Sequence, residues 1–386
     1  MNIIKSNFRL LAFVALIMMI GLACNAVTGG ATPTELPPTQ PPPSQPPPTQ
    51  APESTLPPEP SNTLPAPTEE PTSAPQPTEA PVLESDLLSE DLYIGSEGVF
   101  EFYPPLDWDI TAEDEASIWI EPTDFSGAIY MEVTNTDIGL DGESFERFIA
   151  ARETSDFGSF DNYSEDYSFY ESEDGFAVVE KSLDYEGIPQ LVTTYYEQYD
   201  NVIFTIDFWA DTDALADYQP MFDEFYFNAF PIPDMASALE PYLFVYDFFG
   251  PDDLFTIQVP TGWAYEMSEG DSTVVDTFFS PDEHAVIQNI SFDDGQPVTD
   301  EEAGTVARDL ITNFYAGDVE ITNEEIQEDG SVRLTWNSPG DAFSGNSFYE
   351  TRGTTFLLFT IMWDDEYEDV YFPILDYTVG SYEPSE

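Results

Sequence analysis

The chain has 386 residues, and 76 Asp and Glu residues against 8 Lys and Arg residues give it a formal net charge of −68 at pH 7. This charge excludes a surface for nucleic acids or anionic membranes, because such surfaces need clustered cations that displace counterions. A single Cys and a single His exclude a disulfide framework and a structural zinc site of four such ligands, and any Ser-His-Asp relay would depend on His284.

Residues 1–23 are predicted to be a secretory signal peptide. Two cationic residues precede an apolar run over residues 10–23, which is shorter than the roughly 20 residues that a spanning helix needs. The sequence IGLAC at residues 20–24 resembles the lipobox of bacterial lipoproteins, which ends in the cysteine that receives lipid. That resemblance implies cleavage after Ala23 and lipidation of Cys24, and the alternative is an inert buried cysteine.

Residues 24–83 are predicted to form a disordered tether. Between Ala31 and Pro81, 19 of 51 residues are Pro, and most of the others are Thr, Ser, Gln or Glu. Such a composition cannot bury a core and favours polyproline II at about 3.1 Å per residue, so the segment spans on the order of 150 Å when fully extended. We expect it to hold the folded part away from a membrane.

The remaining chain is predicted to be two copies of one domain, residues 84–234 and 235–386. The sequence VFEFYPPLDW at residues 99–108 aligns without a gap with LFTIQVPTGW at residues 254–263. This match indicates a tandem duplication.

Two later anchors recur in the same order. Trp209 and Trp363 each close an alternating apolar run, at nearly the same distance from the first anchor. Pro220 and Pro373 then follow in similar acidic segments. Because proline is tolerated in the first turn of a helix, we expect a closing helix to start at each of these prolines.

The patterns predict strands, a helix, more strands and a closing helix in each copy. Thr299 begins a capping box that opens the first helix of the second copy, and Phe145, Phe148 and Ile149 mark a weaker counterpart in the first copy. Alternating runs between residues 163 and 209 predict an antiparallel meander. The predicted class is α+β, with two tandem copies of an antiparallel sheet packed with helices.

The opening strand of each copy resembles the PsbP-like family, found in photosystem extrinsic proteins and bacterial secreted proteins. In the second copy the pattern consists of Phe255, Ile257, Pro260, Gly262 and Trp263. The first copy carries a weaker version, with Phe100, Phe102, Pro105, Trp108 and with Asp107 in place of the glycine. The resemblance implies an α-β-α fold and a non-catalytic accessory or binding module.

The acidic residues offer candidate cation sites, because Ca²⁺ takes six to eight oxygen ligands. Two clusters lie just before the predicted closing helices, namely Asp211, Asp213 and Asp217 in the first copy and Asp364, Asp365 and Asp369 in the second. The alternative is a solvated surface, and helix N-termini favour carboxylates without any metal. Apart from Ca²⁺ at these clusters, no cofactor is predicted.

Together these features predict a lipid-anchored protein on the exterior face of the cell membrane, with two acidic, non-catalytic binding or scaffolding domains. The expected partners are the membrane, through the N-terminal lipid, and a protein or glycan at the cell surface. Two alternatives are a polysaccharide hydrolase with paired carboxylates and a Ca²⁺-dependent adhesin. No catalytic residue is predicted, because the pattern does not select one pair among so many carboxylates. The many aromatic residues suit strands and cores, with sugar stacking as the alternative.

Overall fold

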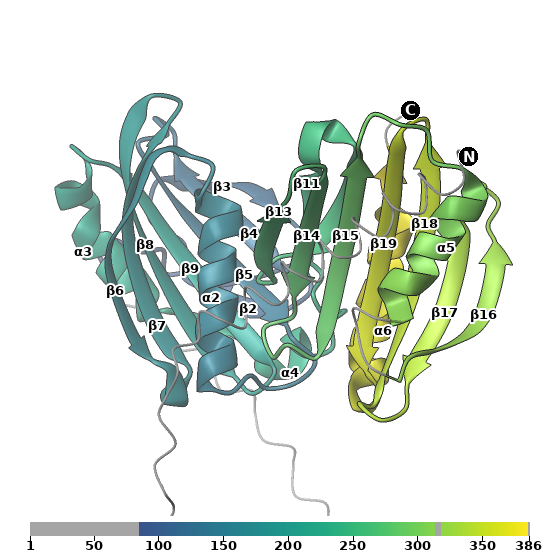
Figure 1. The fold of residues 1–386 in the computed structure, drawn as a ribbon. Helices are drawn as coiled ribbons and strands as arrows, with labels where there is room; N and C mark the ends of the chain where they lie inside the picture. The colour runs from purple at the N-terminus through teal and green to yellow at the C-terminus, as the bar shows by residue number, and fades with distance from the viewer. Residues whose placement is uncertain (1–84, 313–317, 385–386) are drawn as a thin grey trace, which may run out of the picture. The chain divides into compact units, whose positions relative to one another are not determined.

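The computed structural model describes residues 85–312 and 318–384, which form two repeats of one arrangement (Figure 1). The first repeat contains, in chain order, β1 (Tyr93–Ile94), β2 (Phe100–Phe102), β3 (Trp108–Glu113), β4 (Ser117–Pro122), β5 (Gly127–Asn135), α2 (Gly142–Phe157), β6 (Asp161–Glu171), β7 (Phe176–Tyr185), β8 (Ile188–Tyr199), β9 (Val202–Asp211), α3 (Leu215–Tyr226), β10 (Ala229–Pro231) and α4 (Pro233–Ala236). The second repeat contains β11 (Val245–Phe249), β12 (Phe255–Pro260), β13 (Ala264–Glu269), β14 (Thr273–Phe279), β15 (Ala285–Asp293), α5 (Asp300–Leu310), β16 (Glu320–Ile326), β17 (Val332–Ser338), β18 (Phe343–Arg352), β19 (Thr355–Asp364), α6 (Glu368–Ser381) and β20 (Glu383–Pro384).

Each repeat has one large sheet of 7 strands, and the strand order is the same in both. The orders are β3-β4-β5-β9-β8-β7-β6 and β13-β14-β15-β19-β18-β17-β16, with antiparallel pairing throughout. Each repeat also has a sheet of 3 strands, β1-β2-β10 or β11-β12-β20. The predicted α+β class with two tandem antiparallel sheets is therefore confirmed.

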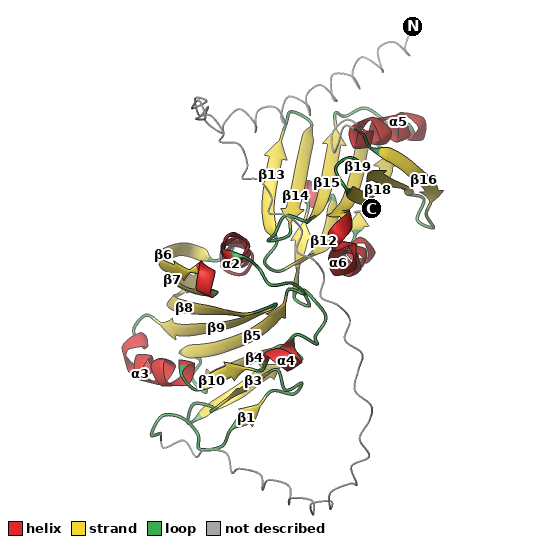
Figure 2. Cartoon of the chain, turned by 90° about the horizontal axis from the view of Figure 1, so that it is seen from below, coloured by secondary structure: helices red, strands yellow, loops and turns green. Residues whose placement is uncertain are grey.

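The helices of each repeat cover opposite faces of its large sheet (Figure 2). In the first repeat, α3 packs on one face through Phe222 and Phe225, and α2 packs on the other through Phe145, Phe148 and Ile149. In the second repeat, α6 and α5 take the corresponding places. Among the described residues, no helix has the length and apolar character needed to cross a membrane.

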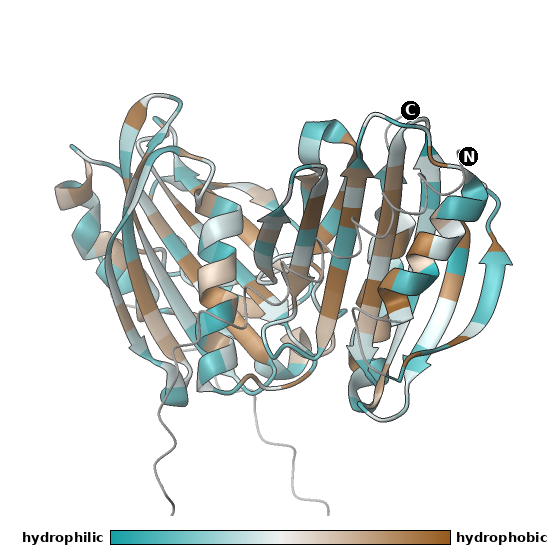
Figure 3. Ribbon diagram, viewed as in Figure 1, coloured by the Kyte–Doolittle hydropathy of each residue, from teal (hydrophilic) through white to brown (hydrophobic). Residues whose placement is uncertain are grey.

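The strands alternate as their sequences predict, and bands of opposite hydropathy follow one another along them (Figure 3). The central strands β9 and β19 are exceptions, because both of their faces are covered. In β9 this is seen in two neighbouring cores. Phe204 and Phe208 contribute to the core under α3, whereas Ile203 contributes to the core under α2. Because a helix covers each face of this central strand, its sequence is a nearly continuous apolar run instead of an alternating one.

The first helix of each repeat begins at a capping residue. The side chain of Asp141 accepts a hydrogen bond of 2.9 Å from the backbone N–H of Ser144, which places α2. Thr299 and Glu302 form the predicted capping box of α5. Both predicted helices are confirmed, since their apolar faces are buried.

The closing helices start earlier than predicted. α3 begins at Leu215 and α6 at Glu368, so Pro220 and Pro373 each lie inside a helix rather than in its first turn. A proline at this position removes a single hydrogen bond to the carbonyl four residues earlier, whereas the preceding turn gains carboxylates that suit a helix N-terminus. Packing of the apolar face onto the sheet therefore outweighs the loss at the proline.

Trp209 and Trp363 are not equivalent, although the sequence suggested that they were. The ring of Trp209 lies 5.5 Å from that of Phe157 on the α2 face, whereas the ring of Trp363 lies 5.1 Å from that of Phe372 on the α6 face. Side chains of a strand alternate between faces, so a shift of one residue in spacing moves a tryptophan to the other side. When β9 and β19 are matched end to end, the counterpart of Trp209 is Met362.

Candidate functional site

Five charged side chains are buried between α2 and the large sheet of the first repeat. We call Glu132, Arg152, Glu153, Lys181 and Asp207 the ionic cluster, and each of them is at most 4% exposed. Removal of one ion from water costs several kcal/mol unless partners compensate for it. The sequence has only three cations between residues 84 and 234, and the fold buries two of them here.

Arg152 reaches the cluster because it lies on the apolar stripe of α2. It follows Phe148 by four residues, and side chains with this spacing share one face of a helix. The same periodicity that points Phe145 and Ile149 at the sheet therefore points the guanidinium there. The apolar pattern of the helix alone does not predict this residue, because an arginine interrupts the apolar stripe.

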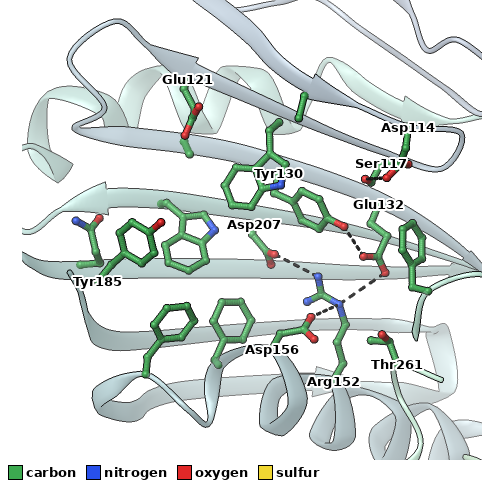
Figure 4. Close-up of a pocket in the computed structure, with 18 of the residues that line it drawn as sticks. Asp114, Ser117, Glu121, Tyr130, Glu132, Arg152, Asp156, Tyr185, Asp207 and Thr261 are labelled. Atoms are coloured by element: carbon green, nitrogen blue, oxygen red, sulfur yellow. Dashed lines mark hydrogen bonds and ion pairs between the residues drawn. The ribbon is translucent and has the colours of Figure 1, made fainter. Parts of the chain in front are cut away.

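The guanidinium of Arg152 is surrounded by oxygen atoms (Figure 4). Its Nη2 donates to Asp207 Oδ2 at 3.2 Å, and its Nη1 donates to the hydroxyl of Tyr196 at 3.1 Å. Its Nε lies 3.3 Å from Asp156 Oδ2 and 3.8 Å from Glu132 Oε1. This buried Nε–H makes no hydrogen bond within the described part of the chain.

Lys181 forms the other half of the ionic cluster. Its Nζ donates to Glu153 Oε1 at 2.5 Å and to the hydroxyl of Thr194 at 2.8 Å. Thr194 in turn donates to Asp207 Oδ1 at 2.6 Å, and the hydroxyl of Tyr196 donates to Glu153 Oε1 at 2.7 Å. Asp207 and Tyr196 therefore link the lysine to the guanidinium in one network.

Burial dominates the protonation of these groups. It raises the pKa of Glu132 and of Glu153, and it lowers the pKa of Lys181. Burial also opposes the charge of Arg152, but attraction by Asp207 and the neighbouring acids raises its pKa above the usual value. The cluster therefore keeps a fixed positive charge among acids whose ionisation is costly.

The second repeat has uncharged side chains at the equivalent positions. On the strands, the equivalence follows from pairing. Asp207 pairs with Tyr130 and Thr194, and Thr360 pairs in the same way with Gln288 and Ser347. On the helices, the equivalence is counted from the N-caps Asp141 and Thr299. The resulting pairs are Glu132 and Ile290, Arg152 and Leu310, Glu153 and Ile311, Lys181 and Trp336, Thr194 and Ser347, and Asp207 and Thr360.

Even the chain of hydrogen bonds has an uncharged counterpart. Trp336 Nε1 donates to Ser347 Oγ at 3.0 Å, and Ser347 Oγ lies 2.9 Å from Thr360 Oγ1. These contacts repeat the order that links Lys181, Thr194 and Asp207 in the first repeat. The same arrangement of helix and sheet thus forms without charged side chains at these positions, so the fold itself does not require the ionic cluster.

A pocket lies on this face of the first sheet, beside the ionic cluster (Figure 4). Its wall is aromatic and is centred on Trp209. The rings of Trp119, Phe157 and Tyr185 lie 6.2, 5.5 and 6.4 Å from the Trp209 ring. At the outer side Phe125 is 70% exposed and Tyr185 is 49% exposed, so the wall extends to solvent.

The charges around the pocket are almost all negative. The first-repeat residues that line it include one guanidinium, that of Arg152, and seven carboxylates, those of Glu113, Asp114, Glu121, Glu132, Asp156, Glu186 and Asp207. The carboxylates of Glu121 and Glu186 make no hydrogen bond or ion pair with any other described residue. They are therefore available to a ligand.

The second repeat lacks this aromatic wall. Trp119 pairs with Tyr130 across β4 and β5, whereas Thr277 pairs with Gln288 across β14 and β15. In place of two rings in contact, with centroids 5.0 Å apart, Gln288 Nε2 donates to Thr277 Oγ1 at 3.1 Å. The aromatic wall and the ionic cluster thus occur together in one repeat and are absent together from the described part of the other.

The six candidate cation ligands do not come together. Asp211 accepts a hydrogen bond of 2.5 Å from Gln190, and Asp365 accepts one of 2.7 Å from Ser344. Asp364 Oδ2 lies 2.6 Å from His284 Nδ1. The other three lie in the turn before α3 or in the first turns of α3 and α6, namely Asp213, Asp217 and Asp369. Among the described residues, no group of three or more His, Cys, Asp or Glu side chains is placed to hold a metal ion.

We therefore expect Ca²⁺ to leave the stability of the protein unchanged beyond its effect as a salt. Thermal unfolding of the mature chain in increasing CaCl₂, against NaCl of matched ionic strength, measures this. A site filled to about 100 times its Kd would add about 2.7 kcal/mol to the free energy of unfolding. A saturable rise of the midpoint in CaCl₂ alone would contradict the expectation and support the adhesin alternative.

The predicted signal peptide over residues 1–23, the lipidation site Cys24 and the tether over residues 24–83 lie outside the described residues. These three features therefore stay predictions from the sequence.

A scan against protein-family models found no match, and a search of curated proteins found none either. Several solved structures are similar to this chain. The chain is similar to cyanobacterial PsbP from Synechocystis sp. PCC 6803, with 16% identity over 36% of this chain and 92% of that chain and a TM-score of 0.31. It is similar to a protein from Bacteroides thetaiotaomicron, with 14% identity over 36% of this chain and 47% of that chain and a TM-score of 0.25. The first is a member of the family that the sequence resemblance named.

Proposed function

We propose that this chain is a lipid-anchored, extracytoplasmic binding protein whose first repeat takes a small ligand without chemical turnover. The observation that carries the proposal is the aromatic pocket with its ionic cluster, which the second repeat replaces by uncharged residues on the same fold. The signal sequence, the lipobox-like segment and the Pro-rich tether support the location at the exterior face of a membrane.

The comparison between repeats supports a functional role for the buried charges. Buried ion pairs are often no more stabilising than well-packed apolar residues of similar volume. The second repeat provides such a replacement, with Leu310 and Ile290 in the places of Arg152 and Glu132. If a ligand contacts the ionic cluster, we expect the buried charges to be kept in the repeat that holds the pocket, although burial of charge is costly.

The contacts of the cluster favour binding over hydrolysis. A general acid must present a protonated oxygen to its substrate. Glu132 accepts hydrogen bonds from Thr134 and Tyr130 on its two oxygens, and Asp207 accepts from Thr194 and Arg152 on its two. All four carboxylate oxygens therefore already accept hydrogen bonds within the protein. This arrangement suits carboxylates that hold their position better than carboxylates that transfer a proton to a substrate.

Ligand-observed NMR with a mixture of neutral, cationic, anionic and sugar fragments tests the binding function. We expect hits with the wild-type chain that are lost when Phe125 and Tyr185 are changed to alanine, because these exposed rings line the pocket. The matched control changes Phe227 and Tyr167, which are 72% and 51% exposed and lie outside the pocket.

The proposal requires that every bound fragment is recovered unchanged after prolonged incubation. It is overturned if no fragment depends on the pocket rings, or if a bound fragment is consumed. Because the paired variants remove equally exposed rings, a general loss of stability would affect both and would be recognised.

A further inference from the structure

We propose that the ligand of the first repeat is a small organic ammonium ion that has an apolar body and carries a hydrogen-bond acceptor. This inference rests on the proposed binding function and names the class of ligand. Three properties of the pocket lead to it: the excess of carboxylates, the aromatic wall and the Nε–H of Arg152, which makes no hydrogen bond within the described residues.

The charge of the pocket selects a cation. The single guanidinium among the first-repeat lining is already engaged, since Arg152 faces Asp207, Asp156 and Glu132 within 3.8 Å. An anion would meet seven carboxylates, and like charges at close range disfavour binding. Glu121 and Glu186 are free to pair with a positive ligand, because no described residue engages them.

The aromatic wall selects an organic cation over a hydrated metal ion. Aromatic faces attract cations through the ring quadrupole, and this attraction suits ammonium groups with apolar substituents. The protein itself shows that the wall accepts such a charge, because Lys181 Nζ lies 3.5 Å from the centre of the Phe157 ring. The rings of Trp119, Tyr130 and Trp209 continue the same wall and face the pocket.

The acceptor on the ligand follows from the Nε–H of Arg152. Arg152 is one of the residues that line the pocket, and its side chain is 1% exposed. Its Nε lies 3.3 Å from Asp156 Oδ2, but the Nε–H makes no hydrogen bond within the described residues. A buried donor without an acceptor is costly, so an oxygen of the ligand that reaches it is favoured. A hydroxyl or carbonyl oxygen a few bonds from the ammonium group meets this requirement.

Isothermal titration calorimetry of the mature chain with choline tests the proposal. The probe 3,3-dimethylbutan-1-ol has the same shape and hydroxyl without the charge, and it separates the charge from the apolar contact. At equal ionic strength we expect choline to bind at least about tenfold more tightly than the uncharged compound. Tetramethylammonium, which lacks the hydroxyl, is expected to bind more weakly than choline.

Two double variants of equal net charge locate the site. Glu121→Gln with Glu186→Gln removes the two free carboxylates of the pocket, and we expect it to weaken choline binding by at least about fivefold. Glu165→Gln with Glu180→Gln removes two exposed carboxylates on β6 and β7, outside the pocket lining, and is expected to leave the affinity unchanged. The control therefore corrects for the general field of this acidic protein.

The proposal fails if the uncharged compound binds as tightly as choline, if both double variants act alike, or if choline and benzyltrimethylammonium release no heat. Fragment screening distinguishes this failure from failure of the proposed function. If neutral or sugar fragments depend on Phe125 and Tyr185 while ammonium ions do not bind, the ligand class is wrong and the binding function stands. If no fragment depends on those rings, both are wrong.

Discussion

Arg152→Leu is expected to lower the free energy of unfolding of the first repeat by about 3–5 kcal/mol, because it leaves buried carboxylates without their cation. Asp207 would lose a donor at 3.2 Å, and Glu132 would lose the positive charge at 3.8 Å. Both carboxylates are at most 3% exposed, so water does not replace the lost partner. Urea unfolding followed by tryptophan fluorescence measures the change.

A combined variant tests whether stability requires buried charges at all, or only requires that no buried carboxylate is left without its cation. Glu132→Ile, Arg152→Leu and Asp207→Thr together install the residues of the second repeat, and we expect most of the lost stability to return. Arg308→Leu is the matched control, because the side chain of Arg308 is 41% exposed and pairs with Glu324 at 2.7 Å, and the change should cost less than about 1 kcal/mol of stability. If Arg152→Leu costs no more than this control, the guanidinium does not stabilise the cluster.

Cys24→Ser is expected to release the protein from the membrane. Each buried methylene of an acyl chain contributes about 0.8 kcal/mol, so two or three chains give an anchor that hardly dissociates. Serine lacks the thiol that would receive the lipid, and the sequence contains no other cysteine to replace it. Partition between detergent and aqueous phases measures the change, and mass spectrometry of the mature N-terminal peptide identifies the lipid.

Asn25→Ser serves as the control for Cys24→Ser, because it changes the neighbouring residue and keeps the thiol. It should remain in the detergent phase with the same lipid mass as the wild type. A Cys24→Ser protein that stays in the detergent phase after removal of residues 1–23 would contradict lipidation as the source of anchoring.

Local patterns predicted much of the fold. Thr299 with Glu302 located the start of α5, and Phe145, Phe148 and Ile149 identified the buried face of α2. These signals succeed because capping and helical periodicity act over a few residues. The start of α3 at Leu215 escaped prediction, because burial of its apolar face against the sheet overrides the local cost of Pro220.

The site depended on facts that the sequence does not show. Trp209 and Trp363 looked equivalent, and only the register of their strands shows that they face opposite sides. Glu132 and Asp207 lie on strands far apart in the sequence, so nothing local reveals that both face Arg152. A usable signal did exist, since an arginine in register with the apolar stripe of a helix, in a chain so poor in cations, marks a buried charge.

The burial of Lys181 leaves the folded repeats without a lysine amine that can react. Lys181 is the one lysine after Cys24 in the sequence, it is 1% exposed, and Glu153 and Thr194 hold its amine. Reagents that acylate lysine amines, and proteases that cleave after lysine, therefore find no accessible lysine on the folded repeats. The rate at which this amine is acylated therefore measures how often the first repeat opens, and no reporter group has to be engineered into the protein.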